Sequence, residues 1–409
     1  MSSPPMLVAR QPIFDRELQV TSYELLFRDD GANRALVADD DVATSQVLLG
    51  AFTEIGLKEL VGERQAYLNV STRFVVEGYA LPLPHDQLVL ELLERAEVTD
   101  ELVAAITGLR RDGYTIALDD FVLNDETRPL LALADVVKVD VLETPRTELP
   151  RVVGELRAFG AKLLAEKVET HEDFEFCHEL GFDLFQGYFL CKPKVVRGRG
   201  IASSRLSTLR LVGRLNEPGA DVGEIEQLIG HDVGLSYRLL RYINSAFFGL
   251  RREITSVRQA LVLLGLDNIR RWATLLALAT VDDKPVELLV TALTRARLCE
   301  LLAPAFPPAD PGSLFTIGVF SVVDAIMDTP MGEVLESLPF AEDVRVALLR
   351  LEGPMGEALR CALACERGDV VTAREGAGSG VLLGELYLEA VAWASQAGDQ
   401  LTASAAAHS

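Results

Sequence analysis

Short apolar runs alternate with amphipathic helical segments over residues 7–193. The runs have the length and the content of branched residues that are typical of buried strands, and the segments between them repeat with a helical period. Strands are expected at residues 20–27, 66–70, 88–93, 115–118, 135–140, 163–165 and 184–190, and helices at residues 42–60, 99–113, 152–159 and 170–181. This alternation predicts βα units around a parallel sheet.

The pattern changes after residue 200, where the strand-like runs end and helical periodicity continues. Helices are expected at residues 222–229, 234–244, 257–264, 268–281, 286–306, 332–338, 344–351 and 382–394. The residues 256–259 have the spacing of a capping box, which would start a helix at 257, and Gly265 is expected to end that helix. We therefore expect a barrel domain at residues 1–193, a linker at 194–204, a helical domain at 205–398 and a frayed tail at 399–409.

Two adjacent carboxylates, Asp119 and Asp120, stand where the apolar run 115–118 ends. In a poorly hydrated place such a pair needs a positive partner, and a polyvalent cation is a good one. The pair would equally suit the start of a solvated loop. The recurrence of the same pattern along the first half of the chain favours a site.

Polar residues stand at or near the ends of several predicted strands: Glu24, Asn69, Glu91, Asp119, Asp120 and Glu166. Each alone could be a polar cap or a loop residue. In a TIM-type barrel the strand ends meet at one mouth, so the six are expected to converge there. Such oxygen ligands suit hard cations, Mg²⁺ or Mn²⁺, rather than Zn²⁺. Lys138 shares a strand face with Asp140 and could hold a water or phosphate oxygen beside them.

Charge and composition exclude several classes of protein. The 409-residue chain has a formal net charge of −22, which argues against a broad nucleic-acid or anionic-membrane surface, although a local basic pocket is compatible with it. No run approaches the roughly 18 apolar residues that span a bilayer, and the N-terminus lacks the regions of a signal peptide. The five cysteines form no CxxC pair and fit reduced, buried thiols. We therefore expect a cytoplasmic protein.

Eight motifs follow one another in the first half of the chain. They are Gln11-Pro12-Ile13, Glu24-Leu25-Leu26-Phe27-Arg28, Leu68-Asn69-Val70-Ser71, Glu91-Leu92-Leu93-Glu94, Asp119-Asp120-Phe121, Lys138-Val139-Asp140, Ala165-Glu166-Lys167-Val168-Glu169-Thr170 and Gln186-Gly187-Tyr188. In this order they closely resemble the EAL-domain family over residues 7–193. The resemblance implies a modified α/β TIM barrel with one antiparallel strand, and cyclic di-GMP phosphodiesterase activity.

The resemblance also implies roles for individual residues in hydrolysis of cyclic di-GMP to pGpG by two metal ions, Mg²⁺ or Mn²⁺. One ion would be held by Glu24, Asn69, Glu91 and Asp119, and the second by Asp119, Asp120 and Glu166. Lys138 and Glu166 would position and deprotonate the attacking water, and Glu169 would support the catalytic loop. The substrate side of the site would comprise Gln11, Arg28, Asp140 and Gln186. Two cations about 3.5 to 4 Å apart would clamp the attacking and leaving oxygens.

Three positions depart from the family's pattern. The signature Glu-Ala-Leu is Glu-Leu-Leu here, with Leu25 beside a proposed ligand. The glycine-containing loop after the second aspartate is replaced by 121–125, where Val122 cannot easily adopt the backbone shapes that glycine permits. In the family that loop joins metal binding to dimerisation, so both activity and a homodimer depend on it. Lys167 replaces a glycine and places a cation beside the proposed base Glu166.

The helical half carries His231-Asp232, the dipeptide of HD metal hydrolases, but the next histidine is His408, so such a site cannot be assembled. The residues 232–240, 243–249, 254–256 and 260–265 instead closely resemble the HDOD family. The resemblance implies an all-α signalling or interaction domain with an unidentified protein partner. Asn244 and Ser245 could bind a ligand, or could form hydrogen bonds at a helix end.

Two hypotheses of different classes follow. In the first, the chain is an active cyclic di-GMP phosphodiesterase tuned by the helical domain, and retention of every proposed metal ligand favours it. In the second, the barrel binds the dinucleotide, turns it over poorly and signals to a protein partner, and the altered loop after Asp120 favours it. A scaffold that binds no nucleotide gives no reason for so many carboxylates at strand ends.

Overall fold

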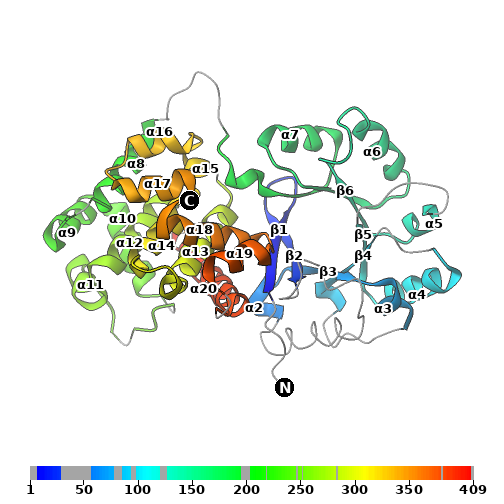
Figure 1. The fold of residues 1–409 in the computed structure, drawn as a ribbon, viewed down its shortest axis with the longest axis horizontal. Coiled ribbons are helices and arrows are strands. Elements are labelled where there is room, and N and C mark those ends of the chain that lie inside the picture. Colours follow the sequence, from blue (N-terminus) through cyan, green and yellow to red (C-terminus); the bar gives the residue numbers. More distant parts are fainter. Residues whose placement is uncertain are drawn as a thin grey trace. The chain divides into compact units, whose positions relative to one another are not determined.

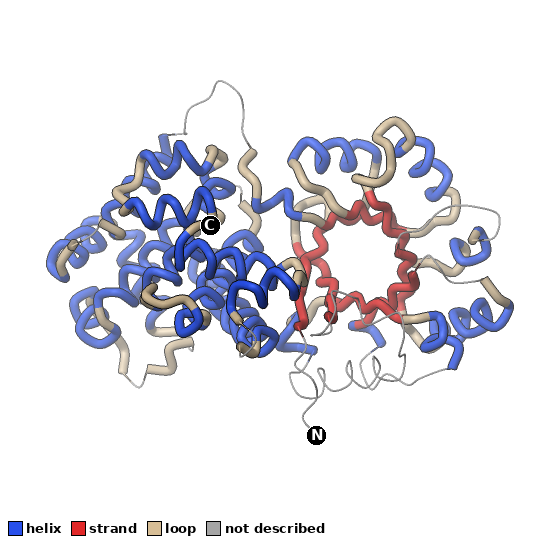
Figure 2. The backbone as a smooth tube through the Cα atoms, viewed as in Figure 1, coloured by secondary structure: helices blue, strands red, loops and turns tan. Residues whose placement is uncertain are grey.

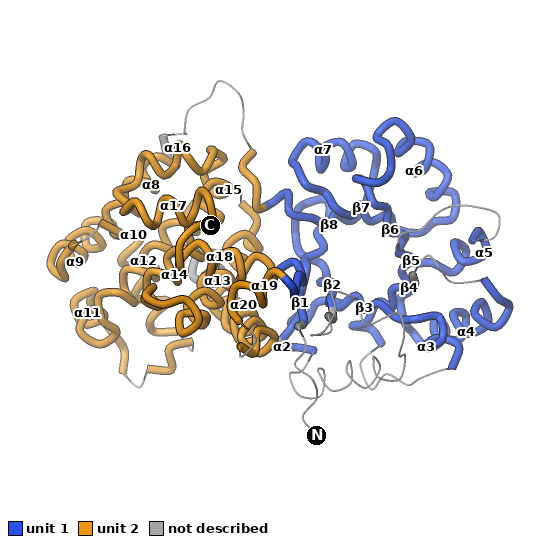
Figure 3. The backbone as a smooth tube through the Cα atoms, in the orientation of Figure 1, with its two compact units in different colours: residues 1–190, 365–371 blue, residues 191–364, 372–409 orange. Residues whose placement is uncertain are grey.

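The computed structural model describes residues 7–28, 57–77, 85–93, 98–119, 127–194, 203–217, 219–245, 247–250, 252–281, 284–378 and 381–406. The chain divides into two compact units, residues 1–190 with 365–371 and residues 191–364 with 372–409 (Figure 3). All five cysteines are free of disulfide bonds, and four of them are buried. No helix in this described part has both the length and the apolar stretch that crossing a membrane requires.

Eight strands close a barrel in the first unit, and Figure 2 shows their ring end on. They are β1 (Leu7–Phe14), β2 (Val20–Arg28), β3 (Gln65–Val70), β4 (Leu88–Leu93), β5 (Thr115–Asp119), β6 (Val136–Asp140), β7 (Lys162–Glu166) and β8 (Leu184–Gln186). β1 runs antiparallel to both β2 and β8, and every other neighbouring pair is parallel. The predicted modified TIM barrel with one antiparallel strand is confirmed.

Helices surround the ring of strands in Figure 1. The first unit contains α2 (Leu57–Val61), α3 (Thr72–Glu77), η1 (His85–Gln87), α4 (Asp100–Arg111), α5 (Arg128–Leu131), α6 (Leu149–Arg157), α7 (His171–Leu180) and η2 (Tyr188–Cys191). Thr99 and Thr170 cap α4 and α7, because each side chain accepts a hydrogen bond from a backbone N–H three residues on. Of the helix expected at 42–60, residues 42–56 lie outside the described part.

The two faces of β6 show how the barrel separates its interior from its helical coat. Val136 belongs to an inner cluster at the barrel axis, with Ile13, Tyr67, Val89, Ala117, Leu164 and Leu184. Val137 and Val139 belong to the outer cluster that the helices cover. Since side chains alternate along a strand, Lys138 shares the inward face with Val136. The packed inner cluster therefore forms a floor under the polar side chains at the strand ends.

The last strand is shorter than expected. The sequence predicts a strand over 184–190, whereas β8 ends at Gln186 and η2 follows. Gly187 has φ of 151°, and a Cβ at this position would lie 2.0 Å from the carbonyl oxygen of Val168. This close approach turns the chain, which periodicity alone cannot reveal.

The second unit is all-helical, as expected. It contains α8 (Ser203–Leu215), α9 (Val222–His231), α10 (Val233–Ile243), α11 (Val257–Leu264), α12 (Leu266–Leu278), α13 (Val286–Leu301), η3 (Ala303–Ala305), α14 (Pro311–Phe320), α15 (Val323–Met327), α16 (Met331–Glu336), α17 (Glu342–Arg350), α20 (Leu383–Ala406) and most of α18 (Gly353–Glu366) and α19 (Val370–Ala377). The nearly all-buried α13 packs against α14 and α20. The tail was expected to fray from residue 399, but α20 continues to Ala406, because alanine favours helix.

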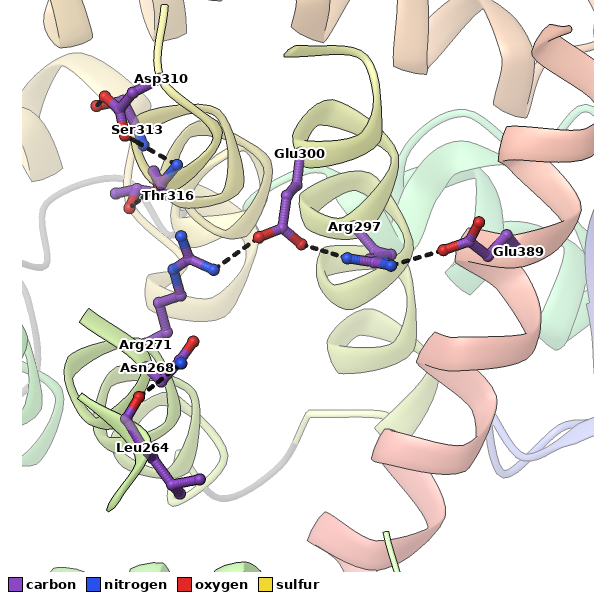
Figure 4. A network of polar contacts seen from close by, with 10 residues as sticks. Leu264, Asn268, Arg271, Arg297, Glu300, Asp310, Ser313, Thr316 and Glu389 are labelled. Carbon is purple, nitrogen blue, oxygen red and sulfur yellow. Dashed lines mark hydrogen bonds and ion pairs between the residues drawn. The ribbon is translucent and has the colours of Figure 1, made fainter. Parts of the chain in front are cut away.

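A chain of alternating charges, called the arginine–glutamate chain below, links three helices of this unit (Figure 4). Glu300 of α13 accepts hydrogen bonds from Arg271 of α12 and from Arg297, both at 2.7 Å. Arg297 in turn donates to Glu389 of α20 at 2.6 Å. The guanidinium carbon of Arg271 also lies 4.7 Å from the ring centroid of Phe315 in α14. The chain therefore fixes α12, α13 and α20 against one another.

Candidate active site

Four carboxylates from four strands surround one ammonium group at the carboxyl ends of the parallel strands. The Nζ atom of Lys138 lies 2.8 Å from Glu91, 2.8 Å from Glu166, 3.1 Å from Asp119 and 3.5 Å from Glu24. An ammonium group has only three protons to donate. One lysine therefore cannot satisfy or neutralise all four acids. The set Lys138, Glu24, Glu91, Asp119 and Glu166 is called the carboxylate cluster below.

Burial makes this charge imbalance costly. Lys138 and Glu91 are fully buried. Burial raises the pKa of Glu91 well above its usual value, and the charge of Glu24 raises it further against the opposing effect of Lys138. Burial would lower the pKa of Lys138, but the charges of Glu24, Glu91, Glu166 and Asp119 outweigh this and raise it. These pKa shifts favour the charged form of Lys138 and the protonated form of Glu91.

Glu166 has a pKa near the physiological range. Burial raises the pKa of Glu166 to about 8, the neighbouring Lys138 lowers it, and the charges of Asp119 and Glu24 raise it. A carboxyl group tuned in this way is able to exchange its proton near neutral pH, which is the property of a general base.

Three amide side chains complete the wall around Glu24. Its Oε1 accepts a hydrogen bond from Asn69 at 3.2 Å, and its Oε2 accepts one from Gln186 at 2.6 Å. The same amide nitrogen of Gln186 donates to Gln11 at 3.0 Å. These contacts bring the predicted residues Gln11, Asn69 and Gln186 to the carboxylate cluster. The Oδ1 atom of Asn69 is buried without a hydrogen-bond partner, so it has a lone pair to offer.

Asp140 and Glu169 are not among the acids that pair with Lys138. Asp140 was assigned to the substrate side of the site, but both its oxygens are engaged: Oδ1 accepts from the N–H groups of Leu142 and Glu143, and Oδ2 from Lys167. These contacts favour a structural role. Glu169 is exposed on the loop after β7 and is not among the carboxylates around Lys138.

Two assigned residues fall outside what the structure describes. Asp120 and the altered loop 121–125 are not among the described residues, and of Arg28, the last residue of β2, only the backbone is described. Their assignments as metal ligand and nucleotide contact stay predictions.

Tyr67 is a neighbour of the site that the sequence did not single out. It lies on the inward face of β3, two residues before Asn69, and only 2% of it is exposed. Burial raises its pKa, as does the charge of Glu91, while Lys138 and a hydrogen bond with Ser22 act against this. The period of two along β3 would have identified it as part of the floor below the cluster.

The carboxylate cluster and Asn69 offer oxygen atoms that suit a divalent cation. In the described residues, no group of three or more His, Cys, Asp or Glu side chains is arranged to hold a metal ion as it stands. The ammonium group of Lys138 lies between the carboxylates instead. Carboxylate and amide oxygens are the ligands that Mg²⁺ and Mn²⁺ prefer. The residues therefore fit such an ion in their chemistry, and the Lys138 side chain has to move for an ion to reach them.

Asn244 and Asp232, two of the polar residues singled out in the helical unit, have structural explanations. Asn244 follows α10, and its amide binds both the N–H and the carbonyl of Ile254, at 2.7 and 2.8 Å. Asp232 caps α10 by accepting from the N–H of Leu235 at 2.9 Å. Asn244 thus forms helix-end hydrogen bonds, one of the two alternatives that the sequence left open.

Comparison with known proteins gives consistent results for both units. The EAL domain model matches residues 79–193, and the HDOD domain model matches residues 205–329. Cyclic di-GMP phosphodiesterase CdgJ of Vibrio cholerae is 35% identical over 367 residues, which cover 88% of this chain and 85% of CdgJ. Protein YuxH of Bacillus subtilis is 32% identical over 406 residues, which cover 95% of this chain and 98% of YuxH.

A solved structure also matches the chain. It is the manganese and cyclic di-GMP complex of BlrP1 from Klebsiella pneumoniae, with 24% identity and a TM-score of 0.36. The match covers 46% of this chain and 56% of the BlrP1 chain.

Proposed function

The chain belongs to the family of two-domain proteins that join an EAL domain to an HDOD domain, and on this basis we propose that it hydrolyses cyclic di-GMP to pGpG. The observation that carries the proposal is the carboxylate cluster at the barrel mouth, which gathers four acids around Lys138. The relative CdgJ, named as a cyclic di-GMP phosphodiesterase, matches over both domains. The barrel domain would comprise residues 1–193, the linker 194–204 and the helical domain 205–398.

The cluster would hold two divalent ions, Mg²⁺ or Mn²⁺. Glu24, Asn69, Glu91 and Asp119 would bind one, and Asp119, Asp120 and Glu166 the other. Bound there, the ions would polarise the phosphodiester and lower the pKa of the attacking water. Because the pKa values of Glu91 and Glu166 are raised in the metal-free site, metal binding would release protons and would strengthen as pH rises.

The side chains of this protein would then do the following. Glu166 would accept the proton of the attacking water. Lys138 would leave the centre of the cluster and orient that water through its ammonium group. Gln186 would hold Glu24 in place, while Gln11 and Arg28 would contact the nucleotide, Arg28 as a two-pronged donor to phosphate. Glu169 would support the loop after β7.

A second candidate is a receptor that binds cyclic di-GMP and hydrolyses it poorly. The sequence of the loop after Asp120 favours this, since Val122 stands where the family has a glycine-containing turn. In either case the helical domain would contact a protein partner, and dimerisation would depend on that loop. The free cysteines support a reducing, cytoplasmic location.

The test is hydrolysis of cyclic di-GMP by the purified chain with Mg²⁺ or Mn²⁺, followed by chromatography of pGpG. Glu24→Ala and Asp119→Asn are each expected to abolish turnover, because each removes a ligand. Glu172→Ala, which removes an exposed carboxylate from α7, is the matched control and should keep full activity. Binding measured with Ca²⁺ separates the two candidates: tight binding without product identifies a receptor, and unchanged hydrolysis in both site variants contradicts the site.

A further inference from the structure

The loop between β7 and α7 is bound to the end of β8. The N–H of Val168 donates to the carbonyl of Gln186 at 2.9 Å, and the N–H of Phe189 donates to the carbonyl of Val168 at 3.2 Å. Gly187 lies against the backbone of Val168, where no side chain would fit. These backbone contacts fix the position of the loop that follows Glu166 on its β8 side.

Lys167 has a backbone conformation that lysine rarely adopts. Its φ is 55°, in the left-handed region that favours glycine. Glycine is the residue that the EAL motif carries here, so it would satisfy the backbone without strain. The backbone conformation thus gives no reason for a lysine here, and the reason must lie in what its side chain contacts.

The side chain of Lys167 reaches Asp140 at the end of β6. The two form an ion pair in which Asp140 is buried and the lysine side chain is 52% exposed. Asp140 also accepts hydrogen bonds from the N–H groups of Leu142 at 2.8 Å and Glu143 at 2.9 Å, which fixes the loop after β6. Burial raises the pKa of Asp140, but Lys167 and the two N–H groups outweigh this and lower it, so Asp140 stays ionised.

Asp140 and Glu166 are direct neighbours in the register of β6 and β7. An uncompensated charge on Asp140 would therefore stand beside the proposed base. The ammonium group of Lys167 compensates that charge, and the ion pair also ties the loop after β7 to the loop after β6. These two strands carry Lys138 and Glu166, which in the proposed reaction orient the attacking water and accept its proton.

We propose that Lys167 is a positioning residue, which ties the loops after β6 and β7 through Asp140 and so holds Glu166 and Lys138 in their working geometry. The inference rests on the proposed function and adds to it a residue that stands where the family has glycine. Substitution of residues that hold metal ligands in place typically lowers metal affinity or activity by about 10 to 100-fold.

The experiment compares Lys167→Met, Lys167→Arg, Lys167→Gly and Asp140→Asn in the full chain. Lys167→Met keeps an unbranched side chain of similar length and removes its charge, so turnover and Ca²⁺ affinity are both expected to fall about 10-fold. Lys167→Arg keeps the ion pair and should retain most of both. Lys167→Gly relieves the backbone and should still show the loss. Lys162→Met removes an exposed lysine at the opposite end of β7 and is the control, with no expected effect.

Two further readouts separate positioning from a general loss of stability. Hydrogen exchange at the Leu142 and Glu143 amides is expected to accelerate in Lys167→Met without a change in the thermal midpoint of the chain. The double variant Lys167→Met/Asp140→Asn should lose no more than the larger single loss, because both changes break the same tie.

The positioning role would be overturned if the two single losses of turnover multiplied in the double variant. It would also be overturned if Lys167→Met kept the hydrogen exchange, Ca²⁺ affinity and turnover of the wild-type chain. If the wild-type chain hydrolyses no cyclic di-GMP, the proposed function fails. The exchange and Ca²⁺ measurements still decide whether Lys167 ties the two loops, since neither depends on turnover.

Discussion

The two units each contain a buried or half-buried charge network, and the two networks are built on opposite principles. In the arginine–glutamate chain, Arg271, Glu300, Arg297 and Glu389 alternate in sign, so each carboxylate meets at least one guanidinium (Figure 4). In the carboxylate cluster, four acids share one ammonium group. The first network is balanced, whereas the second has more acid than its own lysine can compensate.

This difference distinguishes scaffold from site. A balanced network needs nothing from outside and contributes to stability through its hydrogen bonds. An unbalanced one keeps protons on its acids and retains a capacity for added positive charge. The carboxylate cluster is also the more buried of the two, since Glu91 is fully buried whereas the Glu389 side chain is 51% exposed. The buried excess of negative charge thus marks the carboxylate cluster as the candidate active site.

The largest expected effect comes from removing the lysine at the centre of the cluster. Without added metal at pH 8, Lys138→Met should destabilise the chain by about 3–5 kcal/mol, because it leaves buried acids without their cation. Mn²⁺ should restore much of the loss, since the acids are then compensated again. Urea unfolding with and without Mn²⁺ measures both effects.

Lys162→Met serves as the control for this change, because Lys162 is exposed at the start of β7. Wild-type stability of the Lys138→Met chain in the absence of metal would show that the cluster is not strained by its excess acid, and the comparison between the two networks would then be wrong.

The next largest effect is a dependence on pH. The pKa of Glu166 is about 8 in the folded chain, against a usual value of 4.5. The folded chain therefore holds this proton more tightly than the unfolded chain, so metal-free stability should fall as pH rises from about 4.5 to about 8. Glu166→Gln, which cannot ionise, should flatten this part of the profile in urea titrations. Equal slopes for both chains would place the titration elsewhere.

The smallest effects are expected in the balanced network. Glu300→Gln should cost about 1–2 kcal/mol, because it weakens hydrogen bonds to two arginines in a mostly buried place. Glu389→Gln should cost less than about 0.5 kcal/mol, since that pair is half exposed. Neither change should alter turnover per folded molecule, as thermal unfolding and hydrolysis assays would show. A loss of kcat in Glu300→Gln at full stability would make this network part of the function.

The sequence predicted those features that depend on strand period and chain order. Asp119 and Glu166 end β5 and β7, while Glu24 and Glu91 lie inside β2 and β4. Side chains that face the same mouth of a barrel come together whatever the surrounding detail. Spacing cannot show that nearby N–H groups and Lys167 already bind the oxygens of Asp140, and its assignment to the substrate side stays a prediction.

The helical unit illustrates the same limit. Ser256 and Gly265 correctly predicted the two ends of α11, because helix caps depend on residues that are close in the sequence. No helix was predicted at α14, which contains Gly312 and Gly318, residues of low helix propensity. A Cβ on Gly318 would lie 2.3 Å from the Cα of Ala296, so this glycine permits the close packing of α13 and α14. The packing of two neighbouring helices, which helix propensity does not report, accounts for this glycine.

The reversed direction of β1 has a practical consequence for labelling the protein. Leu7 pairs with Arg28, so β1 begins at the edge of the barrel where β2 ends, and a tag placed ahead of β1 would be introduced on the side of the carboxylate cluster. The turn 15–19 between β1 and β2 lies at the opposite rim, and Glu17 is exposed there. A fluorophore or surface tether attached at Glu17 would therefore leave the mouth open to nucleotide.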